Sequence, residues 1–459
     1  VGCCRGSHHI RKLHVQCCSK LVNCRKADIG SAAFDCSDHP ATKPCSCRQI
    51  GLAAPALAPK SPQIVRQVCQ NVSTRIRLTV QYITHYMLSM LHILPLRNAF
   101  SALIVTLLLM LPTLAYAKEG SAFELTKELK AEGFSGTVRV AYHGRVTYQR
   151  SFGLADRTFA VPIDSRTRFH IASITKLFTS VLVLRLVEQG KVELDAPFQR
   201  YLPGYPGQGA EQVTVRQLLG HMSGLPQFDT VTSFDAAIAE GLPNYQQWRS
   251  PKQLLQICCS NGLAARPGER FDYNNADYIV LGHLIEAVTG LSYAEALDQQ
   301  ILRPADLRNT AMAQWSQPTP WLARTYFRRP GGTVFENELP FFWENSYAAG
   351  GLYSSVDDIA RFSDAVFAGR LLSPDSLAQL LKPAGDEYGL GLWSYSFVRR
   401  GIRYGVAKRP GSIMGANTML YRLPDEGLSI VILANSNAVD LDILAQRLAE
   451  AALDGKKIL

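Results

Sequence analysis

Segments rich in β-forming residues stand near both ends of the main part of this 459-residue chain, with a long stretch of helical character between them. Near its start, residues 136–142 and 146–151 are joined by His143-Gly144, a pair suited to the positive φ angles of a tight hairpin. Residues 417–422 and 428–434 form a second pair of β-rich runs near its end. The pattern predicts one antiparallel sheet assembled from the two ends of this part of the chain.

Helices are expected around that sheet. Apolar side chains in residues 441–453 recur with the period of an α-helix, which predicts a terminal helix. Roughly residues 195–345 are helical and rich in loops, and we expect them to form a separate lobe. The predicted fold class is therefore α/β (α+β): an antiparallel sheet built from both chain ends, flanked by helices, with a second, mostly helical lobe.

A targeting signal precedes this part of the chain. Arg97 is followed by a mostly apolar run at residues 100–111, which is too short to span the ~30 Å hydrocarbon core of a membrane. Ala115-Tyr116-Ala117 then supplies the small residues that signal peptidase requires. We interpret residues 87–117 as a secretory signal peptide, residues 1–86 as unstructured or mis-assigned upstream sequence, and residues 118–459 as the folded domain.

This interpretation predicts an exported protein, periplasmic or secreted, that begins at Lys118 and has no stable membrane span in its mature form. Two alternatives stay open. An organellar transit segment would explain the many arginines and few acidic residues, but the abundant cysteines and the lack of an amphipathic period count against it. The other alternative is that the apolar run is retained as a membrane anchor.

The net charge of +10 comes from the residues before the predicted cleavage point. Residues 1–117 carry 13 of the 48 basic and 3 of the 38 acidic side chains, so the remainder holds 35 of each. A neutral domain has no field that attracts a polyanion, and we expect no nucleic-acid partner. Nine of the eleven cysteines also precede residue 70, without the spacing of a zinc site. The other two, Cys258 and Cys259, are neighbours, and we expect them to stay unbridged because their ring would be strained.

The first chemical motif is Ser173 with Lys176 three residues later, at the predicted start of a helix that runs to Gly190. That spacing puts the amine within one turn of the hydroxyl. A serine hydroxyl needs such a base to act as a nucleophile, and a lysine serves as that base only if its pKa is depressed. Because the pattern is common by chance, Ser173 alone would be read as a plain helix cap beside a solvated lysine.

Two further motifs give the first one significance. Tyr273 and Asn275 precede an apolar helical stretch, where the phenol suits proton transfer and the amide suits hydrogen bonding to a substrate carbonyl or to the lysine. Near the end, Lys408-Arg409-Pro410-Gly411-Ser412 leads into the terminal hairpin. A strand that carries a cation and then a glycine brings backbone N–H groups close to a substrate, as an oxyanion hole requires.

Together these motifs resemble those of the serine β-lactamase and penicillin-binding-protein fold, and are most similar to class C β-lactamases and the related carboxylesterases and D-amino-acid peptidases. The resemblance covers about residues 120–455 and includes the stretches 134–138, 152–156, 218–225 and 349–355. It implies a β-lactamase/transpeptidase-like fold that acts through an acyl-enzyme and needs no cofactor or metal.

The resemblance also implies a role for each motif residue. Ser173 would be acylated, with Lys176 activating it and Tyr273 acting as general base or acid. Asn275 would orient the acyl group. The backbone N–H groups of Ser173 and Ser412 would hold the oxyanion. The other family-like residues, His221 and Ser223, are interpreted as structural.

The third motif departs from the family pattern. Pro410 replaces a hydroxyl residue and has no N–H, which weakens recognition of a substrate carboxylate. Arg409 stands where relatives carry lysine or histidine, although a shift of register would put Lys408 there instead. We count Arg409, Gly411 and Ser412 with Asn275 as substrate-binding residues.

The sequence thus predicts an exported serine hydrolase that acts on a small-molecule or peptide ester or amide, as a carboxylesterase, D-amino-acid peptidase or β-lactamase-like enzyme. The alternative is a catalytically weak binding or sensor protein of the same fold. The altered third motif is the feature that keeps this alternative open.

Overall fold

The structure is a computed structural model that describes residues 123–231, 233–383 and 386–459. The predicted signal peptide, the sequence before it, the nine early cysteines and the predicted first mature residue all lie outside these ranges. Within them, no helix is both long enough and apolar enough to cross a bilayer. The same residues contain no group of three or more metal-ligating side chains.

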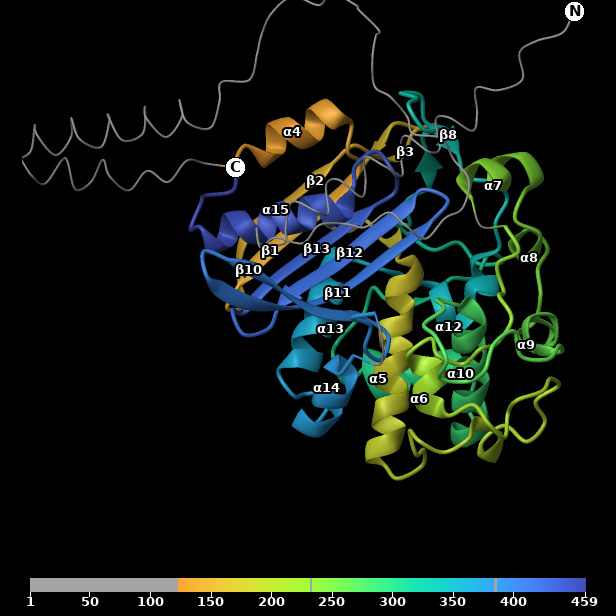
Figure 1. The fold of residues 1–459 in the computed structure, drawn as a ribbon. Helices are drawn as coiled ribbons and strands as arrows, with labels where there is room; N and C mark the ends of the chain where they lie inside the picture. The colour runs from red at the N-terminus through yellow and green to blue at the C-terminus, as the bar shows by residue number, and fades with distance from the viewer. Residues whose placement is uncertain (1–122, 232, 384–385) are drawn as a thin grey trace, which may run out of the picture. The chain divides into compact units, whose positions relative to one another are not determined.

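A six-stranded antiparallel sheet forms the centre of the fold (Figure 1). Its strand order is β10-β11-β12-β13-β1-β2, and β13 from the end of the chain pairs with β1 from its start, with Ile432 opposite Val138. This confirms the predicted sheet. The strands are β1 (Gly136–Tyr142), β2 (Arg145–Phe152), β10 (Trp393–Arg399), β11 (Ile402–Ile413), β12 (Ala416–Leu423) and β13 (Leu428–Ala434).

Tight turns set the register of two hairpins. His143 (φ 47°) and Gly144 (φ 76°) close the β1–β2 hairpin, as the sequence predicted. Met414 (φ 41°) and Gly415 (φ 95°) close the β11–β12 hairpin in the same way. Positive φ at both central residues is the signature of a type I′ turn, whose twist matches that of the strands.

Helices cover both faces of the sheet (Figure 1). On one face lie α4 (Leu125–Glu132) and α15 (Leu441–Leu453), and on the other lie α5 (Thr175–Glu188) and α13 (Val356–Phe367). Successive strand residues point to opposite faces. Accordingly, Ile432 belongs to the core under α15, whereas its neighbour Leu433 belongs to the core shared with the helical side.

The predicted helical lobe is present, and its core continues into the sheet. One apolar cluster joins Leu182 of α5, Ile279 of α10 and Leu433 of β13. The remaining helices are α6 (Val215–Leu219), α7 (Phe234–Glu240), α8 (Pro243–Gln246), α9 (Pro251–Cys259), α10 (Asn275–Thr289), α11 (Tyr293–Leu297), α12 (Tyr347–Gly350) and α14 (Pro374–Leu381). The short strands are β3 (Leu154–Asp156), β4 (Val161–Pro162), β5 (Phe169–His170), β6 (Ala311–Met312), β7 (Tyr326–Phe327), β8 (Glu336–Asn337) and β9 (Leu352–Ser354).

The expectation for the two late cysteines was wrong. Cys258 and Cys259 form a disulfide at the end of α9, with their Cα atoms 3.7 Å apart. Both side chains are buried. The bridge forms where the helix ends, so the local backbone is not held on both sides by helical hydrogen bonds.

We expect the core under α15 to be essential for stability. Leu448 is completely buried there, so Leu448→Ala should lower the free energy of unfolding by about 2–5 kcal/mol through the cavity it leaves. Ile443 on the same helix is 57% exposed, and Ile443→Ala should change it by no more than about 0.5 kcal/mol. Urea titration of both variants tests this, and equal effects would contradict the packing described.

Candidate active site

Ser173 lies in a short 3-10 turn, η2 (Ala172–Ile174), that leads directly into α5. The preceding residue, Ala172, is buried and has φ 46°, a conformation that L-residues adopt only at a cost. Backbone strain of this kind is commonly found at functional sites, where the surrounding structure enforces it. Here it sets the direction in which the chain enters α5 and so places the Ser173 side chain.

Lys176 is the second residue of α5, three residues after Ser173, and is completely buried. Its Nζ is 3.2 Å from Ser173 Oγ and donates to Asn275 Oδ1 (2.6 Å) and to the Ala349 carbonyl (2.9 Å). Burial disfavours the ammonium and lowers the pKa of Lys176. In its unprotonated form the amine has two N–H groups for these two acceptors, and its lone pair is then available to the serine hydroxyl.

Tyr273 contacts the same hydroxyl. Its phenol donates to Ser173 Oγ at 2.9 Å and accepts from Arg409 Nη2 at 2.6 Å. Burial by itself would raise the pKa of Tyr273, but the charges of Arg409 and Lys176 more than offset it and lower the pKa to about 8. The phenol is therefore able to exchange a proton near neutral pH.

The structure decides which cation of the third motif lies in the site. Arg409 is completely buried, and each of its nitrogens donates to a protein group: Nη2 to Tyr273, Nε to the Ser173 carbonyl (2.6 Å) and Nη1 to Tyr388 Oη (2.9 Å). Lys408 points to the other face of the sheet and pairs with Asp442 of α15. The sequence predicted that Arg409 binds substrate. In the structure its guanidinium instead contacts Tyr273 and the backbone of Ser173.

The end of β11 presents a free backbone edge to Ser173. The pairing of β11 with β10 ends at Lys408, so the rest of β11 has no partner among the described strands on that side. On its other side β11 pairs with β12, and the two-residue turn between them makes Ile413 and Ala416 a hydrogen-bonded pair. Hydrogen-bonded pairs alternate along β11, so the backbone groups of Pro410 and Ser412 point away from β12. Pro410 therefore breaks no ladder bond, and the Ser412 N–H faces the free edge.

Gly411 is needed because the backbone of η2 packs directly against it. A Cβ at this position would lie 2.5 Å from the Ile171 carbonyl oxygen and 2.9 Å from the Ser173 nitrogen. The glycine thus lets β11 approach the backbone of Ser173 closely. The oxyanion role of the Ser173 and Ser412 N–H groups, and substrate binding by Gly411 and Ser412, stay predictions.

A buried polar cluster fixes the segment that carries Tyr273 and Asn275. Asn274 caps α10 and donates its backbone N–H to His221 Nδ1 (3.2 Å). His221 Nδ1 also lies 2.8 Å from Asp277 Oδ2, and Ser223 Oγ donates to the other oxygen of Asp277. These contacts agree with the structural interpretation of His221 and Ser223.

Both side-chain N–H donors of Asn275 are engaged within the protein. Its Oδ1 accepts from Lys176, and its Nδ2 donates to Asp229 Oδ2 (2.7 Å) and to Tyr245 Oη (3.1 Å). Tyr245 in turn donates to Asp229 Oδ1. The sequence predicted that Asn275 bonds either to the lysine or to a substrate carbonyl, and the structure shows the bond to Lys176. The amide has no spare N–H donor for a substrate carbonyl.

Sequence reasoning missed Tyr388, Asp229, Tyr245 and the Ala349 carbonyl. The stretch around Ala349 is among the family-like segments of the sequence, but the sequence did not indicate that the Ala349 carbonyl accepts a hydrogen bond from Lys176. Asp229, Tyr245 and Tyr388 belong to no recognisable spacing, because each reaches the site through contacts distant in the chain.

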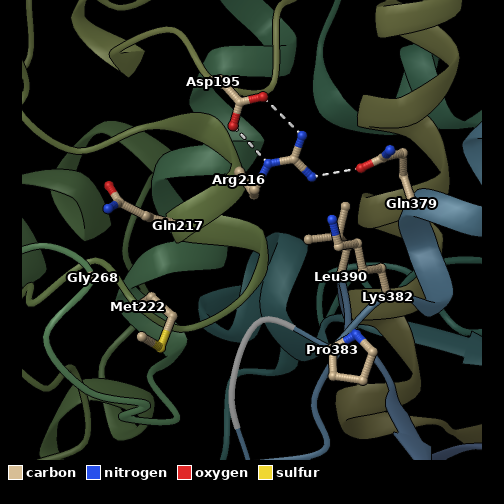
Figure 2. Close-up of a pocket in the computed structure, with 9 residues that line it drawn as sticks. All are labelled: Asp195, Arg216, Gln217, Met222, Gly268, Gln379, Lys382, Pro383 and Leu390. Carbon is tan, nitrogen blue, oxygen red and sulfur yellow. Dashed lines mark hydrogen bonds and ion pairs between the residues drawn. The ribbon is translucent and has the colours of Figure 1, made fainter.

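A pocket of about 500 Å³ lies apart from these residues (Figure 2). Arg216 crosses it, paired with Asp195 (2.6 Å) and donating to Gln379 (2.8 Å), as the dashed lines show. None of Ser173, Lys176, Tyr273 or Arg409 lines this pocket. It is therefore not the place where the candidate catalytic groups meet.

Comparison with known proteins gives a consistent result. The family model described as Beta-lactamase matches residues 124–453. Esterase EstB of Burkholderia gladioli is 31% identical over 55% of this chain and 70% of its own length, and penicillin-binding protein 4* of Bacillus subtilis is 27% identical over 66% and 68%. The crystal structure of D-amino acid amidase from Ochrobactrum anthropi is 25% identical, with a TM-score of 0.61, and covers 72% of this chain and 97% of that chain.

The lowered pKa of Tyr273 can be measured directly. We expect tyrosinate absorbance to reveal one phenol that ionises near pH 8, and this step should vanish in Tyr273→Phe. In Arg409→Gln the step should move to higher pH, because the cation that stabilises the phenolate is gone. Thermal melting of each variant controls for folding. An unchanged titration in Tyr273→Phe would show that this phenol is not the one perturbed.

Proposed function

Because the chain belongs to the β-lactamase family and is a serine hydrolase of that family, we propose that Ser173 is its nucleophile and that Lys176, Tyr273 and the β11 edge assist it. The observation that carries this proposal is the position of Ser173 Oγ, 3.2 Å from a buried amine and 2.9 Å from a phenol of lowered pKa. A hydroxyl between two groups that exchange protons is the arrangement that nucleophilic catalysis requires.

Acylation follows from these contacts. Neutral Lys176 takes the proton of Ser173 as Oγ attacks the substrate carbonyl, and the N–H groups of Ser173 and Ser412 stabilise the oxyanion. Tyr273 passes a proton to the leaving group, which departs as an alcohol or amine. Water then attacks the acyl-enzyme, with the same groups moving its proton, and releases the acid.

We propose esters and amides of small carboxylic or amino acids as substrates, rather than β-lactams. The names of an esterase and a D-amino acid amidase among the similar proteins support this class. Pro410 offers neither a hydroxyl nor an N–H at the free edge of β11, and Arg409 has its nitrogens engaged by protein groups. Pro410 and the buried Arg409 therefore present no accessible donor to a carboxylate such as that of penicillin. No observation favours the alternative of a binding or sensor protein.

We further propose that the protein is exported. Support comes from the segment 87–117, with its arginine, short apolar run and Ala115-Tyr116-Ala117.

The proposed roles predict a clear hierarchy of variants. Ser173→Ala should abolish both hydrolysis of p-nitrophenyl esters and labelling by a fluorophosphonate probe. Lys176→Met should lower the rate of acylation by about 10²-fold, the scale of a lost general base. Lys191→Met, at an exposed lysine just after α5, is the matched control and should match the wild type. Labelling that persists in Ser173→Ala would rule out this nucleophile.

Export gives a separate prediction. When the full chain is expressed in a bacterium, N-terminal sequencing of the processed protein should begin at Lys118. The variant Ala117→Asp should block this cleavage, because signal peptidase requires a small residue there. A protein recovered from the cytoplasm with residues 87–117 intact would contradict export.

A further inference from the structure

Asp229 is the one carboxylate that contacts the Lys176–Asn275 pair in the described part of the chain, and no step of the proposed mechanism uses it. Its two oxygens accept from Asn275 Nδ2 (2.7 Å) and from the Tyr245 hydroxyl. The side chain is partly exposed. Each carboxylate oxygen accepts two hydrogen bonds, so these contacts leave acceptor capacity on both oxygens.

The neighbouring groups offer acceptors and aromatic faces, but few donors. Both N–H groups of Asn275 are taken by Asp229 and Tyr245. The ring of Tyr245 stacks on Phe341 with centroids 4.7 Å apart, and Phe341 packs on Trp343 at 4.8 Å. A negative charge beside aromatic rings favours a cation, whereas a neutral amide carbonyl finds no free donor on Asn275.

This surface lies close to the reacting carbon. Lys176 Nζ contacts both Ser173 Oγ (3.2 Å) and Asn275 Oδ1 (2.6 Å), and Asp229 is the next hydrogen-bonded group beyond Asn275. In an aminoacyl-enzyme the α-nitrogen is only three covalent bonds from Oγ. The Asp229 carboxylate is linked to Ser173 Oγ by three successive contacts, through Lys176 Nζ and the Asn275 amide, and so lies on the same side of the site as the lysine.

We propose that Asp229 is a specificity-determining residue that selects substrates whose acyl group carries a free ammonium, that is, esters and amides of unprotected amino acids. This inference rests on the proposed function and narrows its substrate class. An acyl group whose nitrogen is masked as an amide has no charge for Asp229 to bind. Its amide carbonyl also finds no free N–H donor on Asn275.

The test compares two esters of the same shape. Alanine methyl ester carries NH₃⁺ where methyl isobutyrate carries CH₃. Both enantiomers of the alanine ester are tested. The release of methanol is measured at a pH where the amine is protonated. The ammonium also activates the carbonyl inductively, so the ratio of kcat/KM for the two esters is compared between enzymes. Asp229→Asn keeps the shape of the side chain and removes its charge.

We expect the preference for the better alanine enantiomer over isobutyrate to fall by about tenfold to hundredfold in Asp229→Asn, the scale of a lost charged hydrogen bond. Any general effect of the substitution on Lys176 acts on both esters alike and cancels in the ratio. Asp235→Asn, at an exposed carboxylate of α7 nearby in sequence, makes the same charge change and should leave the ratio as it is.

The outcomes separate the two proposals. Turnover that depends on Ser173, with a ratio unchanged in Asp229→Asn, overturns the role of Asp229 and leaves the serine hydrolase intact. Faster hydrolysis of N-acetylalanine methyl ester than of the free amino ester by the wild type also overturns it. If none of these esters is hydrolysed in a manner that depends on Ser173, both the proposed function and this narrower substrate class fall.

Discussion

The buried guanidinium of Arg409 is the interaction on which the arrangement of the site depends. It comes from β11 in the sheet and binds the Ser173 carbonyl, the Tyr273 phenol and Tyr388 on the helical side. A buried charge is costly unless every donor finds a partner, so the three contacts act together. They hold β11, Ser173 and Tyr273 in one position.

The same charge decides the protonation of the site. Burial favours neutral forms of both Lys176 and Tyr273, and Arg409 opposes it only at the phenol, where its charge stabilises the phenolate. At Lys176 the guanidinium adds to the effect of burial, since a like charge disfavours the ammonium. One fixed cation therefore favours the unprotonated amine and the ionised phenol beside a single hydroxyl.

The departures from the family pattern follow from this use of the cation. Arg409 is completely buried and donates from each of its three nitrogens to a protein group, so it is not accessible to a substrate carboxylate, and Pro410 adds no donor. Charge at the other side of the site comes from Asp229, which is negative and partly exposed. The two sides together fit a substrate that carries a positive charge on its acyl group better than one that carries a carboxylate.

Local patterns in the sequence determined much of the fold and, together with the family resemblance, pointed to the candidate catalytic groups. Both terminal hairpins, the helix at 441–453 and the helices after Ser173 and Tyr273 form where period and turn residues predicted, because those signals act over a few residues. Tertiary structure alone decided that Arg409 and not Lys408 enters the site. A strand alternates faces at every residue, so this choice depends on the register imposed by the β11–β12 hairpin. It also decided that Asn275 turns its amide toward Asp229 and that Cys258 bonds to Cys259, since these contacts depend on how distant segments pack and on how a helix ends.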